Sequence, residues 1–124
     1  MDVIAAAASG GNQGVFEAVA ATGAKAFGVD VNQCGQSAGN VIDNVLKHVD
    51  VAESAAIKEI AAGRTGGVKV YGLAEGGVGV NALEAGVASS GCTVASSPDV
   101  IAKVKQARDD IVAGKITVAD PLKG

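Results

Sequence analysis

Residues 3–30, VIAAAASGGNQGVFEAVAATGAKAFGVD, decide the fold of this chain. An apolar run is followed by a glycine-rich loop, an amphipathic segment and a second apolar run that ends in the carboxylate of Asp30. This order predicts a strand, a glycine turn, a helix and a second strand, which together form a βαβ unit. Such units bind ligands at the carboxyl ends of their strands. We therefore expect Gly10, Gly11 and Asp30 at one ligand-binding edge.

The length predicts a single domain over residues 1–124, the alternation of strands and helices predicts an α/β class with a mostly parallel sheet, and the composition argues against nucleic-acid binding. The chain of 124 residues has 18 glycines but only three aromatic side chains, Phe16, Phe27 and Tyr71. The core must therefore consist of Val, Ile, Leu and Ala. A net charge of -3 lacks the basic surface that a phosphate backbone requires, and few aromatic rings are present to stack on bases.

The sequence predicts neither a membrane span nor a metal site. No apolar run approaches the roughly 20 residues that span a bilayer, and the N-terminus does not resemble a signal peptide. Cys34 and Cys92 are far apart, and His48 is the only histidine, so we expect no metal and no cofactor. Two unpaired thiols are the favoured prediction for the cysteines. A disulfide in an oxidising compartment is the alternative.

Helices are predicted where apolar residues recur at helical spacing between capping residues. One is expected over 14–22 with Gly23 as its C-cap, and another over 50–62 with Asp50 and Glu53 as a capping box. A third is expected to begin at Pro98, with Ser97 as cap, and to run to residue 113. Periodicity also favours a helix over 41–49. A short helical turn is expected over 82–88.

Strands and loops are predicted from alternation and from glycine content. Residues 31–40 are polar and contain glycine, so they are expected to form an irregular loop over the ligand edge. The run 75–80 has too many glycines for a helix. Residues 89–97 read as loop or irregular strand. The predicted strands are 25–29, 68–73 and 115–118.

The candidate site residues each have a plainer structural explanation. The Gly10-Gly11-Asn12 turn can present N–H groups to a ligand at a helix N-terminus, or it can be only a tight βα turn. Asp30 can accept hydrogen bonds from two adjacent sugar hydroxyls, or it can stabilise the following loop.

Other polar residues are expected to have no catalytic role. His48 is expected to be packed or at the surface, because it lacks a catalytic partner at a productive spacing. Asp43, Asp109 and Asp110 are expected to be solvated helix charges rather than a general acid–base pair. The sequence therefore does not predict an enzyme.

Several runs together resemble the basic membrane protein family of solute receptors, which deliver purine nucleosides to ABC transporters. They occur in the family's order and span nearly the whole chain. The matching runs are Asp2-Val3-Ile4 with the following Ala-Ala-Ala-Ser-Gly-Gly and Gly14-Val15-Phe16, Phe27-Gly28-Val29-Asp30 with Asn32-Gln33, the run 45–52, and Tyr71-Gly72-Leu73-Ala74-Glu75-Gly76-Gly77-Val78-Gly79.

The resemblance implies part of the C-terminal lobe of a type I periplasmic binding protein. That lobe is an α/β, three-layer, Rossmann-like or flavodoxin-like domain, with a mostly parallel sheet and helices on both faces. The resemblance also implies a strand over 41–47, which we adopt in place of the helix that periodicity favours.

The function that the resemblance implies is nucleoside binding between two lobes, with an ABC transporter permease as partner and an extracytoplasmic location. Asp30 matches the acidic residue that accepts the ribose hydroxyls, and Gly10-Gly11 match a ligand-facing turn. Family members often have lysine where this chain has Ala74, which makes a second sugar contact less secure.

Two alternatives come from other classes of protein. A lobe without solute binding can act as a structural domain or form a homodimer through its incomplete sheet. A small Rossmann-like enzyme with a phosphorylated cofactor would need a phosphate-binding motif, and the sequence shows none.

Overall fold

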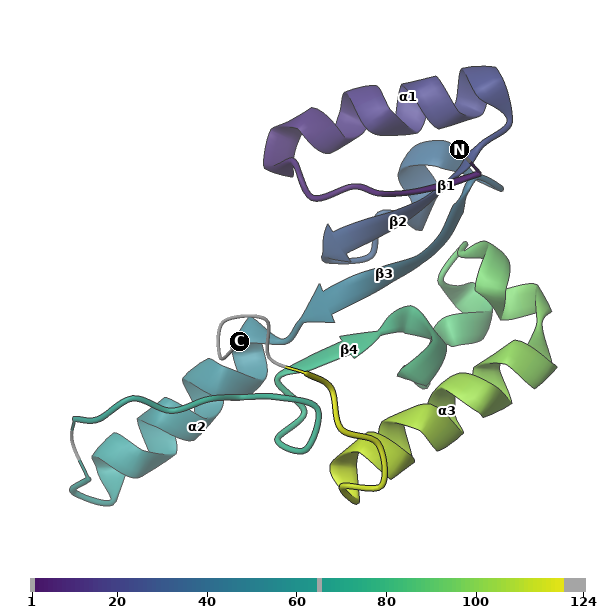
Figure 1. The fold of residues 1–124 in the computed structure, drawn as a ribbon. Coiled ribbons are helices and arrows are strands. Elements are labelled where there is room, and N and C mark those ends of the chain that lie inside the picture. Colours follow the sequence, from purple (N-terminus) through teal and green to yellow (C-terminus); the bar gives the residue numbers. More distant parts are fainter. Residues whose placement is uncertain (1, 65, 120–124) are drawn as a thin grey trace.

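The computed structural model describes residues 2–64 and 66–119. Helices and strands alternate through the first half of the chain. In the second half, short 3-10 turns connect the last strand to a long final helix (Figure 1). The main elements are β1 (Val3–Ala5), α1 (Asn12–Thr22), β2 (Lys25–Asp30), β3 (Val41–Lys47), α2 (Val49–Ala61), β4 (Val78–Val80) and α3 (Pro98–Val112).

The four strands form one sheet in the order β1-β2-β3-β4. The pairs β1–β2 and β2–β3 are parallel, whereas β3 and β4 are antiparallel. The predicted α/β class with a mostly parallel sheet is therefore confirmed. Because β1, β2 and β3 run in the same direction, their carboxyl ends lie at one edge of the sheet.

β3 shows where periodicity failed. The apolar spacing favoured a helix over 41–49, but residues 41–47 form a strand between β2 and β4, as the family resemblance implied. Val41, Asp43, Asn44 and Leu46 are all buried. A strand buried on both faces loses the simple alternation of apolar and polar residues, so its spacing can imitate that of a helix.

The core is built from small and branched side chains around a single phenylalanine. Phe16 and Val19 of α1 are fully buried in one cluster with Ala26 of β2 and Val41 of β3. Ile101 and Val104 of α3 pack against the same cluster and are only half-buried. The apolar face of α3 is therefore only partly covered.

The helix boundaries confirm some capping predictions and correct others. Gly23 ends α1 with a φ of 73°, and Pro98 occupies the start of α3, as predicted. The capping box of α2 is wrong, because His48 is the N-cap residue and Asp50 lies inside the first turn. Ser97 caps α3 by position, but its side chain makes no capping hydrogen bond.

Two predicted strands do not form. Residues 68–73 and 115–118 pair with no strand in the part of the chain that the structure describes. Val68 and Val70 are 96% and 82% exposed. Alternation alone does not make a strand, because the backbone N–H and C=O groups also need a neighbouring strand.

Between β4 and α3 the chain forms three short 3-10 turns. The predicted turn over 82–88 is divided into Asn81–Leu83 and Val87–Ser89, and Thr93–Ser96 follows in the segment predicted as loop or irregular strand. β4 occupies the end of the glycine run.

α2 and the following extended segment form an arm that projects from the sheet (Figure 1). None of the α2 residues is buried. Lys69 forms an ion pair and a hydrogen bond with Glu59, which joins the extended segment to α2. The hydrogen bond from Lys69 lowers the pKa of the Glu59 carboxyl group below its usual value. This pairing is therefore complete above the ordinary carboxyl pKa and is lost as pH falls through the lowered one.

The cysteines form a disulfide, so the prediction of two unpaired thiols is wrong. Cys34 and Cys92 are bonded, with 4.9 Å between their Cα atoms and 58 positions between them in sequence. Both residues are buried in the core cluster. Their spacing in sequence gave no indication of pairing, because the fold brings the loop after β2 next to the segment before α3.

Candidate functional site

Three chain segments meet at the carboxyl edge of the parallel strands. β1 leads into the 3-10 turn Ser9–Gly11, β2 ends at Asp30, and β3 ends at Lys47. We call Ser9–Gly11, Asp30 and Lys47 the strand-end edge. The glycine turn and the carboxylate that the sequence singled out therefore lie at the same edge of the sheet.

Gly10 and Gly11 are exposed in this turn. A Cβ atom added to Gly10 would meet nothing within 4 Å, whereas one added to Gly11 would lie 3.3 Å from the Cβ atom of Ala8. Gly10 thus leaves open space above the backbone. Gly11, which has no side chain, allows the backbone of the turn to approach Ala8 closely. The Gly11 N–H donates to the Ala8 carbonyl oxygen at 2.9 Å.

Asp30 occupies a strained turn at the end of β2. Its φ is 69°, and the Val31 N–H donates to the Val29 carbonyl oxygen at 2.9 Å, which closes a γ-turn around it. Its carboxylate accepts an ion-pair contact from Lys47 Nζ at 2.8 Å, and both side chains are more than half exposed. The turn therefore presents a carboxylate to solvent beside a lysine.

Backbone strain in the described residues coincides with the strand-end edge. The non-glycine residues with positive φ are Ser9, at 53°, and Asp30, at 69°. L-residues adopt this region at an energetic cost, and such residues concentrate at ligand clamps and active sites. Ser9 lies in the turn after β1 and Asp30 at the end of β2, so both strained residues belong to the strand-end edge.

Asn12 is the one predicted site residue that lies beneath the edge. It is 2% exposed. Its Oδ1 accepts a hydrogen bond from the Ala8 N–H at 2.8 Å, and its Nδ2 donates to Gln33 Oε1 at 3.1 Å. The amide therefore holds the glycine turn through its oxygen and the loop after β2 through its nitrogen.

The structure adds buried amide side chains that sequence reasoning did not select. Asn44 of β3 accepts from the Gln33 N–H through Oδ1, and its Nδ2 lies 2.7 Å from Asn81 Oδ1 and 3.0 Å from Cys34 Sγ. The available signal was the Asn-Gln-Cys run after Asp30, which the sequence placed in a loop over the ligand edge and matched in part to the family without marking its side chains as site residues.

Asp43 corrects another prediction. It was expected to be a solvated helix charge, but it lies on β3 and is 3% exposed. Its Oδ1 accepts hydrogen bonds from the N–H groups of Asn44 and Asn81, and its Oδ2 accepts one from the Ala82 N–H. The carboxylate therefore organises the turn after β4.

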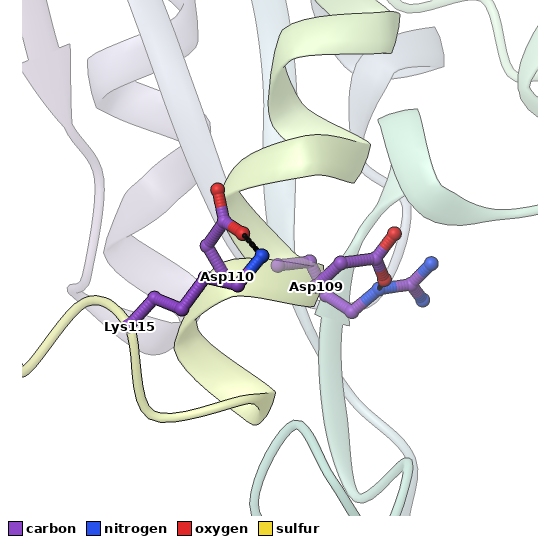
Figure 2. A network of polar contacts seen from close by, with 4 residues as sticks. Asp109, Asp110 and Lys115 are labelled. Atoms are coloured by element: carbon purple, nitrogen blue, oxygen red, sulfur yellow. Dashed lines mark hydrogen bonds and ion pairs between the residues drawn. The ribbon is translucent and has the colours of Figure 1, made fainter.

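Asp109 and Asp110 are helix charges with separate cationic partners (Figure 2). Asp109 pairs with the neighbouring Arg108 at 2.6 Å, and Asp110 pairs with Lys115 at 3.0 Å. Partly exposed His48 lies 3.5 Å from Glu84. None of these groups belongs to the strand-end edge.

The strand-end edge is an open surface. A cavity of about 440 Å³ lies between α2 and residues that include Arg64, Lys69 and Tyr71, and another of about 280 Å³ lies near His48 and Glu84. Neither is lined by Asp30 or by the glycine turn. The residues of the strand-end edge are all exposed and belong to neither of these cavities.

Open α/β sheets bind their ligands at the carboxyl ends of parallel strands, where the strand-end edge lies. The family model described as ABC transporter substrate-binding protein PnrA-like, Bmp, matches residues 1–115. The chain belongs to this family, which confirms the resemblance inferred from the sequence. It is a family of solute-binding proteins of ABC transporters, not of enzymes.

A solved structure supports the same fold. The chain resembles an ABC transporter system solute-binding protein from Aeropyrum pernix K1 with a TM-score of 0.68 and 28% sequence identity. The match covers 98% of this chain and 41% of that protein, so the chain spans less than half of its length. Comparison with curated proteins gave no significant match. Within residues 2–64 and 66–119, no helix combines the length and apolar character that crossing a bilayer requires.

Proposed function

We propose that this chain is part of an ABC transporter receptor and binds a nucleoside or a similar ribose-containing solute at the strand-end edge. Asp30 accepts hydrogen bonds from the sugar hydroxyls, and Gly10 and Gly11 allow the solute to approach the backbone. Asn12 supports the glycine turn from below. The observation that carries the proposal is the exposed Asp30 carboxylate in a strained turn beside the glycine turn.

The chemistry of Asp30 suits a diol. An ionised carboxylate accepts hydrogen bonds through two oxygens, which match the spacing of adjacent ribose hydroxyls. Lys47 Nζ contacts one of these oxygens, Oδ1, and orients the carboxylate. Because both side chains are exposed, this ion pair adds little to the stability of the fold, and the solute can rearrange it.

A second lobe is part of the same proposal. The solved solute-binding protein is more than twice the length that this chain covers, and the strand-end edge here is open. Closure of another lobe over the edge would bury the rest of the solute, and a permease would receive it from the closed receptor. The disulfide supports an extracytoplasmic location, because disulfides persist mainly in oxidising compartments.

Replacing Asp30 by glycine should separate binding from stability. Glycine adopts a φ of 69° without strain, so Asp30→Gly should leave the free energy of unfolding unchanged or higher. Loss of hydrogen bonds to a charged group should weaken nucleoside binding by about tenfold or more. The measurements are amide NMR titration with inosine, adenosine and guanosine, and urea unfolding.

Asp30→Asn is the matched control, because asparagine also tolerates positive φ and retains one acceptor oxygen. Its affinity should lie between those of the wild type and Asp30→Gly. Equal nucleoside affinity in all three proteins would show that Asp30 does not contact the solute.

A second proposal is self-association through an edge strand. β1 pairs with β2 on one side, and Val3 is 46% exposed. Ile57 and Ile60 of α2 are also exposed. Exposed strand edges and apolar side chains favour pairing with a second copy. Light scattering over a range of concentrations should then show a rise in mass, whereas a constant monomer mass would contradict this proposal.

A further inference from the structure

Gln33 lies between the two segments of the strand-end edge that face the proposed solute. Its Oε1 accepts hydrogen bonds from the Val29 N–H and from Asn12 Nδ2, both at 3.1 Å. Val29 directly precedes Asp30, and its carbonyl oxygen closes the γ-turn. One side-chain oxygen therefore contacts the end of β2 and the start of α1.

Asn12 extends this connection to the glycine turn. Its Oδ1 accepts from the Ala8 N–H, and the Ala8 carbonyl oxygen accepts from the Gly11 N–H. A continuous series of hydrogen bonds thus runs from Val29, through the Gln33 and Asn12 amides, to the turn that contains Gly10 and Gly11.

The backbone of Gln33 is itself held from β3. Its N–H donates to Asn44 Oδ1 at 3.1 Å, and Asn44 is fully buried. Asn44 Nδ2 also contacts Cys34 Sγ, a sulfur atom of the disulfide, at 3.0 Å. Gln33 therefore extends from a fixed base, which limits how far its side chain can move.

Close packing around Gly28 leaves little room for another arrangement. A Cβ atom at Gly28 would lie 2.1 Å from Asn44 Oδ1 and 2.7 Å from Gln33 Oε1. The two amide oxygens thus lie directly against the backbone of β2. The absence of a side chain at Gly28 allows both to reach the strand immediately before Asp30.

We propose that Gln33 is a positioning residue that holds Ser9–Gly11 and Asp30 in one fixed geometry for solute binding. This inference rests on the proposed function for its ligand, but the coupling between the two segments exists without ligand. Loss of the Gln33 acceptor leaves the N–H of Val29 and the Nδ2 group of Asn12 without this partner. The end of β2 and the glycine turn then both become less rigid.

The test compares Gln33→Met with Gln33→Glu. Methionine has a similar length but no amide acceptor, whereas glutamate retains an acceptor oxygen. Without ligand, Gln33→Met should accelerate amide hydrogen exchange at Ala8, Gly11 and Val29 by about tenfold and shift their NMR signals. Gln33→Glu should keep exchange close to that of the wild type. Gln36→Met, in an exposed position of the same loop, is the matched control and should change neither segment.

The same variants are then titrated with inosine. Gln33→Met should bind about tenfold more weakly, while Gln33→Glu and Gln36→Met should bind like the wild type. If Gln33→Met accelerated amide exchange at Val29 but not at Ala8 and Gly11, the proposed coupling between the two segments would be wrong. Equal affinity of Gln33→Met and the wild type would overturn the positioning role. If the wild type binds no nucleoside, the proposed function loses its ligand, while the exchange experiment still decides the coupling.

Discussion

Removal of the Cys34–Cys92 disulfide should lower the free energy of unfolding by about 4 kcal/mol. The bond closes a loop with a sequence separation of 58, and cross-linking such a loop reduces the conformational entropy of the unfolded chain. The loss should be large for this domain, because native domains are stable by only roughly 5–15 kcal/mol. Urea unfolding of the double variant Cys34→Ala/Cys92→Ala measures this loss.

Reductant provides the control for this experiment. A dithiol that exchanges with the disulfide becomes oxidised and leaves two protein thiols, so the reduced wild type should approach the stability of the double variant. The double variant should not respond to the same reductant. Identical unfolding curves for the oxidised wild type and the double variant would contradict a stabilising disulfide.

Replacing Asp43 should have the second large effect. Asp43→Ala removes the acceptor of three buried N–H groups, those of Asn44, Asn81 and Ala82. Each unpaired buried group costs about 1–3 kcal/mol, so we expect a loss of about 3 kcal/mol or more. Urea or thermal unfolding, with the disulfide intact, measures the change.

Asp43→Asn refines the same experiment. Asparagine retains one oxygen for Asn44 and Asn81 but places an NH₂ group opposite the Ala82 N–H, so its effect should be smaller than that of alanine. Glu53→Ala, at an exposed position on α2, is the control and should change stability by about 0.5 kcal/mol at most. A loss in Asp43→Ala no larger than in this control would show that the carboxylate does not organise the turn.

Local pattern was sufficient to predict the first βαβ unit. The apolar runs at both ends of residues 3–30 and the glycine turn between them lead directly to β1, α1 and β2. Gly23 and Pro98 marked helix boundaries because their backbone preferences act within the chain segment itself. The same pattern placed Asp30 and the glycine turn at one edge, since parallel strands end together.

Local pattern failed where a segment depends on distant neighbours. Residues 68–73 alternate as a strand does, but in the described chain they lie beside α2 and pair with no strand. Residues 41–47 have helical spacing, but they are buried between β2 and β4. Asp43 was misplaced for the same reason, because its burial follows from the strand and not from its own polarity.

The sequence by itself determined the α/β class, the family, and the meeting of a glycine turn with Asp30 at one sheet edge. Hydrophobic period and glycine position encode the fold class and the shared edge within short segments, whereas the family was indicated by the resemblance of several runs along the chain. Only the tertiary structure decided that Cys34 bonds to Cys92, that Asp43 is buried, and that Gln33 joins the end of β2 to the start of α1. Such contacts join residues that are distant in sequence, and they exist only once strand pairing and packing have set the distances between them.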